Sequence, residues 1–321
     1  MDFELTADQE SLQAGIRSFL DGRFPLDAIR DIESTGRLDR PRWAELGETG
    51  VFSMTLPEAD GGLELGISES ALVFEELGRA LVPGPLVATF LAAPYVEGAS
   101  TGDTVVGLYE PAEPVSVVEH LPDLDALLVL DGTGIRRVDP TSVATTPVER
   151  PVDALSPVWV VDGMMPDGEL VADAAAARQA RLAGIVLTAA LQLGVALRAT
   201  ELATDYAKER EQFGRVIGSF QAVKHLCADM LVRAEVARAA VYAAAVALDG
   251  RSDDDPVRAA AVAKTMAGDA AIANGKSSIQ VHGGIGFTWE VDAQRFWKRA
   301  TVLDTHFGNS DEHADAVAAM L

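Results

Sequence analysis

Long alanine-rich segments with few glycines or prolines dominate the chain from residue 173 to its end. Two of them read AAAARQARLAGIVLTAALQLG and MLVRAEVARAAVYAAAVAL. Alanine has the highest helix propensity, and small side chains allow long helices to pack closely against one another. Residues 173–321 are therefore predicted to form an antiparallel bundle of helices.

Two regions of different texture precede this bundle. Residues 1–98 read as helices joined by short turns, with Thr6 as a good N-cap for the first helix. Residues 99–172 contain short β-branched runs such as ALLVLD and VWVVD, separated by turn residues, and are predicted to form a small β domain. The chain is thus expected to be mostly α with a small β insert, in three domains.

The charge balance and the composition exclude several classes of protein. The chain has 26 Lys and Arg against 49 Asp and Glu, a net charge of −23 that repels nucleic acid and anionic membranes. It has no long uninterrupted apolar run and no signal pattern at its start, so neither a membrane span nor export is expected. A cytoplasmic location is expected instead. The single cysteine, Cys227, leaves no internal disulfide and no zinc spacing, so no metal site is expected.

Basic residues and glycines gather in REQFGRVIGSFQAVKH, residues 210–225. Gly214 and Gly218 interrupt the helical pattern, and a glycine turn before a helix exposes N–H groups that favour an anion. The guanidinium groups of Arg210 and Arg215 are well suited to phosphate. From the residues alone, the stretch is either a phosphate-binding corner or a helix–turn–helix corner with solvated cations.

Three glycines within four residues mark a second stretch, QVHGGIGFTWE at residues 280–290. Such spacing cannot continue a helix without cost. The stretch is not a GxGxxG fingerprint and follows no predicted strand, which excludes a Rossmann site. It is either a place where another group approaches the backbone closely or a tight turn held by Phe287 and Trp289.

Four motifs, in the right order, resemble the acyl-CoA dehydrogenase family. LPEADGGLELG and EELGRAL resemble its N-terminal domain, while REQFGRVIGSFQAVKHLCADM and QVHGGIGFTWE resemble its two signatures. The resemblance implies the fold of that family. Its parts here would be an N-terminal helical domain (1–98), a shortened middle β domain (99–172) and a C-terminal four-helix bundle (173–321).

The resemblance also implies FAD as a cofactor that lies between subunits. The corner would grip the pyrophosphate and adenosine end of an FAD bound mainly to the neighbouring subunit, and the glycine-rich turn would contact the same cofactor. By motif match, the predicted cofactor-binding residues are Arg210, Gln212, Phe213, Gln221, Gln280, Gly283 and Gly284.

The reaction of this family needs a carboxylate that removes the α-proton of an acyl-CoA thioester. Setting THFGNS on the family's Tyr-Glu-Gly-Thr stretch puts Phe307 at the position of the base, and phenylalanine accepts no proton. The second base position known in the family falls near Gly184, in RLAGIVLTAAL, which has no carboxylate. We therefore predict no catalytic residue. We also expect residues 99–172 to lack the family's Thr-Glu-Pro…Gly-Ser-Asp segment and its tryptophan-containing strand, which hold the flavin ring.

These features predict a half-site subunit of a heteromeric acyl-CoA dehydrogenase, an oxidoreductase of the α2β2 type. A full-length homologue would supply the base, bind the acyl-CoA and pass electrons to an electron-accepting flavoprotein. The ending HFGNSDEH resembles that of short actinobacterial subunits, and this subgroup implies CoA esters of steroid side chains as substrates.

Three alternatives stay open. The chain could be an independent enzyme with Glu290, Asp304 or Glu312 as its base. It could be a binding or scaffold subunit of the same fold without flavin, or a flavin monooxygenase of this fold, which needs no α-proton base. The stretch THFGNSDEH has neither metal spacing nor a nucleophile–base pair, so it is expected to be neither a metal site nor a catalytic triad.

Overall fold

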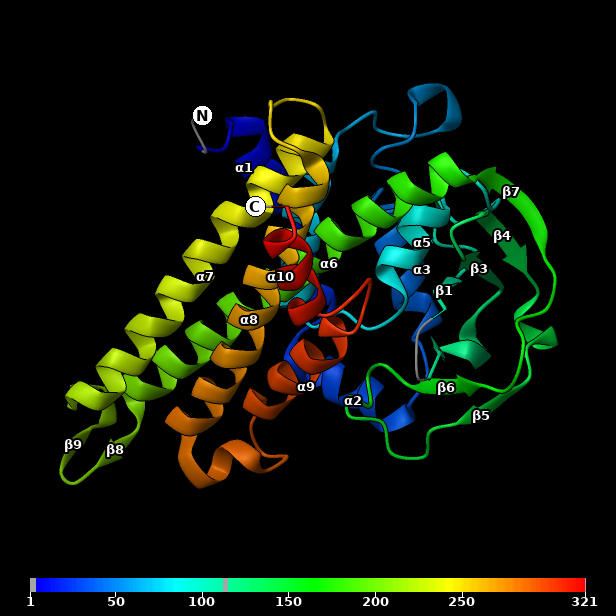
Figure 1. Cartoon of the computed structure of the whole chain (residues 1–321). Helices are drawn as coiled ribbons and strands as arrows, with labels where there is room; N and C mark the ends of the chain where they lie inside the picture. The colour runs from blue at the N-terminus through cyan, green and yellow to red at the C-terminus, as the bar shows by residue number, and fades with distance from the viewer. Residues whose placement is uncertain (1–3, 112–114, 321) are drawn as a thin grey trace. The chain divides into compact units, whose positions relative to one another are not determined.

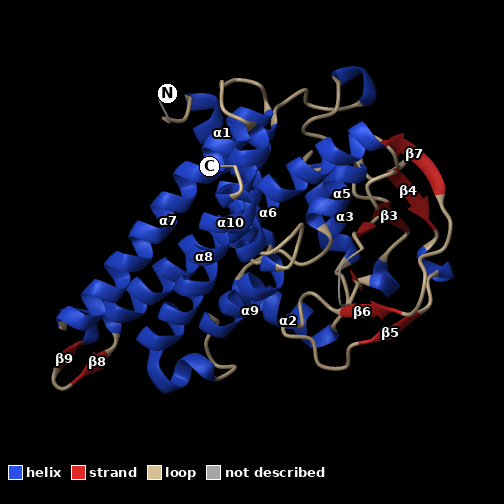
Figure 2. Ribbon diagram, in the orientation of Figure 1, coloured by secondary structure: helices blue, strands red, loops and turns tan. Residues whose placement is uncertain are grey.

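The computed structural model describes residues 4–111 and 115–320. Helices make up most of these residues, and the strands of the two larger sheets fall between residues 106 and 173 (Figures 1 and 2). The predicted fold class, mostly α with a small β insert, is confirmed. The chain groups into two compact units, which we call the bundle unit (Met1–Leu26, Ala71–Val82 and Ile185–Leu321) and the strand unit (Asp27–Ser70 and Pro83–Gly184).

The bundle unit is built from long helices, in which α8 packs against α7, α9 and α10. Helix α6 begins in the strand unit and continues through the bundle unit. A two-stranded hairpin, β8–β9, connects it to α7. The elements of this unit are α1 (Ala7–Arg23), α4 (Ile67–Arg79), α6 (Ala174–Glu209), β8 (Glu211–Gln212), β9 (Arg215–Val216), α7 (Gln221–Leu248), α8 (Pro256–His282), α9 (Ala293–Asp304) and α10 (Ser310–Ala318).

Small residues explain why these helices lie so close together. A Cβ at Gly194 in α6 would overlap the carbonyl oxygen of Glu75 in α4, so only glycine fits there. A Cβ at Gly275 in α8 would lie 2.8 Å from the Cα of Trp297 in α9. Small residues, here two glycines, thus allow the helices to contact one another at backbone distance, as predicted.

Helix α1 begins where the sequence indicated. The Thr6 side chain accepts a hydrogen bond from the N–H of Gln9, and the Gln9 side chain bonds back to the N–H of Thr6. This reciprocal capping box satisfies donors that a helix start otherwise leaves unpaired. The prediction of Thr6 as N-cap is confirmed.

The strand unit contains two sheets. The first has the order β1-β3-β4-β7, with β1 parallel to β3 and the other pairs antiparallel; the second has the order β2-β6-β5 and is antiparallel. The elements of this unit are α2 (Leu26–Thr35), α3 (Arg40–Glu48), α5 (Leu86–Ala92), β1 (Val106–Tyr109), β2 (Val117–Glu119), β3 (Ala126–Leu130), β4 (Gly134–Val138), β5 (Thr145–Pro147), β6 (Val158–Val161) and β7 (Glu169–Asp173). Short 3₁₀ helices lie in connections of both units: η1 (Glu58–Asp60), η2 (Leu121–Asp123), η3 (Pro140–Ser142), η4 (Ile217–Ser219) and η5 (Gly283–Phe287).

The core of the strand unit lies where the first sheet meets α5 and the start of α6. Leu128 and Leu130 of β3 and Ile135 of β4 pack there with Ala92 and Ala177. All five residues of β3 are buried, which explains its continuous apolar run.

The expectation that residues 99–172 lack a tryptophan-containing strand is wrong. Trp159 lies in β6, the central strand of the second sheet, and is half-buried. The run VWVV pairs with β2 on one side and β5 on the other, because β-branched and aromatic residues favour a pleated surface even in a short segment.

Among the described residues, α6 is the one helix long and apolar enough to cross a membrane. However, 83% of its most apolar stretch is buried inside the protein. This burial is typical of the core helix of a bundle.

Candidate cofactor-binding site

The β8–β9 hairpin turns at Phe213 and Gly214, whose φ angles are 55° and 76°. Two positive φ angles in a two-residue loop are typical of a type I′ turn, which matches the twist of a hairpin. Glycine adopts this conformation freely, but a bulky residue such as phenylalanine rarely does. The Phe213 side chain is 92% exposed and meets Phe220 edge to face, with ring centroids 6.0 Å apart.

Helix α7 starts directly after this hairpin. Its N-cap residue, Phe220, has an apolar side chain that cannot bond the first N–H groups of the helix. The Arg215 guanidinium lies over the Phe220 ring, 4.1 Å from its centroid. Open N–H groups and a nearby cation form a surface that favours an anion.

The three glycines after α8 differ in their conformation and in the space around them. Gly283 is the C-cap of α8, with φ 67° and ψ −145°, a conformation that is essentially restricted to glycine. A Cβ at Gly286 would lie 2.6 Å from the carbonyl oxygen of Ile279, so this glycine is needed for packing. A Cβ at Gly284 would meet no heavy atom of the described residues within 4 Å. The turn therefore offers an open backbone at Gly283 and Gly284.

The structure brings both motifs to the same end of the bundle. Helices α7 and α8 run antiparallel, and Arg233 Nη1 of α7 donates to Asn274 Oδ1 of α8 at 3.2 Å. The Tyr206 ring, near the end of α6, stacks on His282 at 4.3 Å between centroids. Figure 1 shows β8, β9 and the last turns of α8 together at the lower end of these helices. We call residues 210–221 and 280–290 the bundle end.

All seven predicted cofactor-binding residues lie at the bundle end, and all are exposed. Their role toward a cofactor stays a prediction. They form an open surface of a guanidinium, amides, one aromatic ring and bare backbone, namely Arg210, Gln212, Phe213, Gln221, Gln280, Gly283 and Gly284.

Two aromatic residues of this surface were not predicted as part of it. Phe287 is 75% exposed and Trp289 is 62% exposed, so they do not hold the turn from inside. Lys298 Nζ lies 4.2 Å from the centre of the Trp289 ring, a cation–π contact that keeps the ring at the surface. Their place directly after a glycine-rich turn was the only sequence signal for such exposure.

Phe307, at the predicted base position, has nearly the same positive φ angle as Phe213 but is buried. Its φ is 56°, that of Gly308 is 94°, and its side chain is 6% exposed. His313 Nε2 forms a hydrogen bond with the Phe307 carbonyl at 2.9 Å. Asn309 and Glu312 cap α10 in a reciprocal box, which fixes the turn from its other side.

Two of the alternative bases are engaged in structural interactions. Asp304 Oδ1 accepts a 2.6 Å hydrogen bond from Ser310 Oγ, and Glu312 Oε2 accepts from the N–H of Asn309 at 3.1 Å. Glu290 is exposed. Among the described residues, no group of three or more His, Cys, Asp or Glu side chains could hold a metal ion.

Lys264 of α8 is fully buried next to the turn between α9 and α10. Its ammonium donates to the carbonyls of Leu303 at 3.2 Å and Asp304 at 3.0 Å, the last carbonyls of α9. Burial lowers the pKa of Lys264 to about 8, and the Asp304 carboxylate offsets part of that effect. A cation at a helix C-terminus stabilises the helix, so Lys264 anchors the end of α9.

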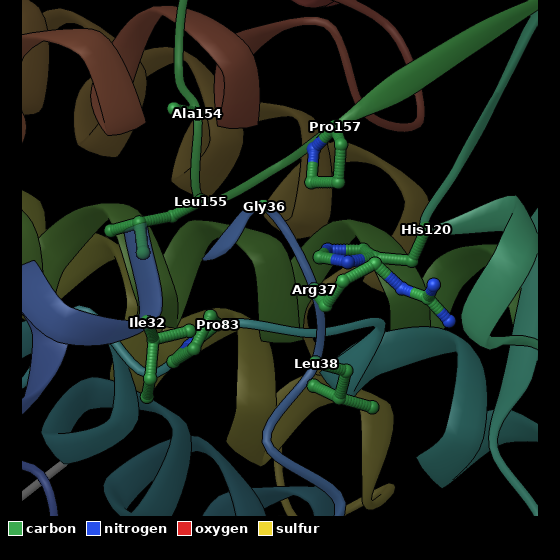
Figure 3. A pocket seen from close by; sticks show the side chains of 9 residues that line it. All are labelled: Ile32, Gly36, Arg37, Leu38, Pro83, His120, Ala154, Leu155 and Pro157. Carbon is green, nitrogen blue, oxygen red and sulfur yellow. The ribbon is translucent and has the colours of Figure 1, made fainter. Parts of the chain in front are cut away.

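A small cavity in the strand unit is not a candidate for the acyl-CoA site. Its walls include Ile32, Arg37, His120 and Pro157 (Figure 3). Arg37 is engaged by Asp123, to which its Nε donates at 2.8 Å. The cavity is far smaller than ligand pockets, which measure about 300–1,000 Å³.

Two family models match the chain. The model described as "Acyl-CoA dehydrogenase, N-terminal domain" matches residues 6–101, and the model described as "Acyl-CoA dehydrogenase, C-terminal domain" matches residues 176–321. Acyl-CoA dehydrogenase FadE34 of Mycobacterium tuberculosis is 36% identical over 99% of this chain, but the chain spans only 48% of FadE34. Acyl-CoA dehydrogenase IpdE2 of Mycolicibacterium smegmatis is 32% identical over 92% of this chain and 93% of its own length.

Solved structures share the fold over the whole chain. The ChsE4-ChsE5 complex from Mycobacterium tuberculosis contains a chain with a TM-score of 0.83 and 22% identity, over 99% of this chain and 98% of that one. PigA, solved with FAD and proline, gives a TM-score of 0.84 at 20% identity, over 100% of this chain and 99% of its own. At these identities the likeness establishes the fold.

Proposed function

The chain belongs to the acyl-CoA dehydrogenase family, and on this premise we propose that it is a subunit of a heteromeric acyl-CoA dehydrogenase. In this proposal it completes an FAD site that a full-length partner mainly holds, and the partner supplies the catalytic base. The observation that carries the proposal is a contrast within one chain. The residues that match the cofactor motifs are exposed, while the residue at the base position is a buried phenylalanine.

The bundle end has the chemistry that the far end of an FAD needs. Arg210 offers a guanidinium fork for a phosphate, and the amides of Gln212, Gln221 and Gln280 offer donors and acceptors. Gly283 and Gly284 allow a ligand to approach the backbone closely, since a Cβ at either position would meet no heavy atom of the described residues within 4 Å. When bound, the flavin would accept the hydride that leaves the substrate.

The exposure of these residues supports a cofactor shared with another chain. A pocket inside one chain buries most of its ligand and most of its own lining. Phe213 is 92% exposed and also has a positive φ, so the free chain bears both the strain and the exposed apolar surface. A partner that covers Phe213 would remove the second of these costs.

The turn after α9 supports the lack of a base in this chain. Phe307 accepts no proton, Asp304 is bonded to Ser310, and Glu312 caps α10. The partner of the proposal is therefore a full-length acyl-CoA dehydrogenase with an intact glutamate, in an α2β2 assembly that delivers electrons to an acceptor flavoprotein. FadE34 and IpdE2, both named acyl-CoA dehydrogenases, and the two-protein ChsE4-ChsE5 complex support this direction. CoA esters of steroid side chains are the first substrate class to test, because the ending HFGNSDEH resembles that of the subunits associated with them.

The test is to purify the chain alone and together with a full-length homologue. The expected result is no stoichiometric FAD and no acyl-CoA oxidation by the chain alone, and both in the complex. Arg210→Ala should reduce the FAD content of the complex, while the matched surface control Arg251→Ala should not. Stable FAD and turnover by the chain alone would overturn the half-site proposal, and a complex without FAD would favour the scaffold alternative.

A further inference from the structure

A row of polar residues runs through the core between α6 and α8. Thr188, Gln192 and Thr200 lie at intervals of four and eight residues on α6, so they share one face of the helix. Lys264 and Asn274 lie on α8, and all five residues are buried. Buried polar groups in such a row need hydrogen-bond partners.

The half of this row around Asn274 is satisfied by the protein. Asn274 Nδ2 donates to Thr200 Oγ1 at 3.1 Å and to the carbonyl of Met230 at 2.8 Å. Its Oδ1 accepts from Arg233 Nη1 at 3.2 Å. This half links α6, α7 and α8 without any added molecule.

The half around Gln192 is not satisfied in the same way. Gln192 is 0% exposed, yet neither its Nε2 nor its Oε1 has a hydrogen-bond partner among the described residues. The hydroxyl of Thr188 also has no hydrogen-bond partner among the described residues. Thr188 lies one turn earlier on α6 and is likewise 0% exposed. Leaving such groups unpaired in a core costs about 1–3 kcal/mol for each, so native proteins rarely do so.

The unpaired amide lies close to a second polar pair. A Cβ at Gly268 of α8 would be 3.3 Å from Gln192 Nε2 and 2.6 Å from Asp304 Oδ1, with Ser310 Oγ nearer still. Ser310 Oγ donates to Asp304 Oδ1 at 2.6 Å. Three helices, α6, α9 and α10, therefore direct polar atoms toward Gly268 of α8, where the lack of a Cβ lets these atoms come close to the helix backbone.

We propose that Gln192 and Thr188 bind an ordered water molecule that bridges α6 to the Asp304–Ser310 pair of α9 and α10. Water suits this site because it can both donate and accept, as the amide and the hydroxyl require. A cation is less suited, since the Asp304 carboxylate already accepts from Ser310 and lies 3.7 Å from the Lys264 ammonium. The bridge holds α6 against the turn that carries Phe307, and it does not depend on the proposed function.

The first test is a crystal structure of the full chain at a resolution that orders internal water. We expect a water molecule about 2.7–3.2 Å from Gln192 and from Asp304 or Ser310. A direct hydrogen bond between Gln192 and Asp304, with no water between them, would overturn the proposal. So would an atom with several oxygen ligands at about 2.3–2.6 Å, which is the signature of a cation.

The second test uses substitutions that keep shape and remove polarity, Gln192→Met and Thr188→Val. Each should lower Tm by about 2–4 °C, and the double variant should lose less than the two shifts added together, because both side chains bind the same water. A Tm that stays the same or rises in both variants would show that no partner was lost, and would contradict the proposal. If Gln192→Met does not fold, Thr188→Val and the crystal structure still decide.

Discussion

Two Phe-Gly pairs in this chain have similar positive φ angles and opposite surroundings. Phe213-Gly214 has φ angles of 55° and 76°, and Phe307-Gly308 has 56° and 94°. Phe213 is 92% exposed at the bundle end, whereas Phe307 is 6% exposed in the turn between α9 and α10. The same left-handed phenylalanine is thus held by the chain itself in one place and is left without cover in the other.

The contacts around each pair explain why Phe307 is held in place by the chain itself and Phe213 is not. The turn at Phe307 is fixed by His313, by the α10 capping box and by Lys264, so the chain itself compensates the backbone strain. At Phe213 the neighbours are Phe220 and a single hairpin. A strained residue that the surrounding fold does not enclose is a signature of function more often than of stability.

The largest effect on stability is expected at Phe307, the buried phenylalanine. Phe307→Ala removes a fully packed ring and should lower the free energy of unfolding by about 3–5 kcal/mol. Phe213→Ala is the matched control, and its exposed ring should change stability by no more than about 0.5 kcal/mol. Urea unfolding of the two variants measures both values. Equal losses would show that the environments of the two pairs are more alike than the structure indicates.

Lys264, behind the buried pair, gives that turn a pH dependence. Its pKa of about 8 in the folded chain lies below the ordinary value of 10.5, so between these pH values the unfolded chain binds more protons. Stability should therefore rise with pH from about 8 to 10.5 through this group, by up to roughly 1.4 kcal/mol for each pH unit.

The comparison of wild type with Lys264→Met isolates this contribution. Unfolding free energies at several pH values should show a rise in the wild type that the variant lacks. A difference that is constant across this range would mean that folding does not lower the pKa of Lys264. The bundle end is the internal reference, because Arg210→Ala should leave the pH profile unchanged.

Two glycines extend the comparison to the backbone. Gly268→Ala would place a Cβ 2.6 Å from Asp304 Oδ1 of α9 and nearer still to Ser310 Oγ of α10, and should cost about 1–3 kcal/mol because these side chains or their helices must shift. Gly284→Ala meets open space in the free chain and should leave its stability nearly unchanged, while it weakens FAD retention in the complex. Thermal unfolding of the free variants and the flavin content of the complexes separate the two effects. Destabilisation of the free chain by Gly284→Ala would place that turn in the core.

Local sequence signals predicted the helix ends and turns well, because their causes lie within a few residues. Thr6 and Gln9 form their box within one turn, and Gly214 and Gly283 have the positive φ angles that only glycine adopts freely. The four motifs indicated the whole fold by their resemblance to a family, whereas the alanine-rich pattern by itself predicted only a bundle of helices.

The environments of the same residues could not be predicted in this way. Phe213 and Phe307 both precede glycine, and nothing within a few residues separates the exposed ring from the buried one. Burial depends on contacts between distant segments, such as those of Lys264 in α8 with the end of α9. The unpaired Gln192 likewise becomes visible only when α6, α9 and α10 are placed together. The run VWVVD predicted a strand around Trp159 but not its two partners in the sheet, which lie farther away along the chain.

The sharpest test of the comparison is Phe213→Gly, whose effect on stability should be small. Glycine relieves the left-handed strain of about 1–2 kcal/mol but adds entropy to the unfolded chain, so the net change should stay within about 1 kcal/mol. If a partner covers the ring, the same variant should weaken the complex by at least about tenfold, as the loss of a central aromatic contact does. Titration calorimetry with the partner measures this loss, and Leu170→Gly, an exposed apolar residue of the strand unit, is the control. Unchanged affinity would mean that the exposed Phe-Gly pair is only a tight hairpin turn, and the contrast with Phe307 would then be one of packing and not of function.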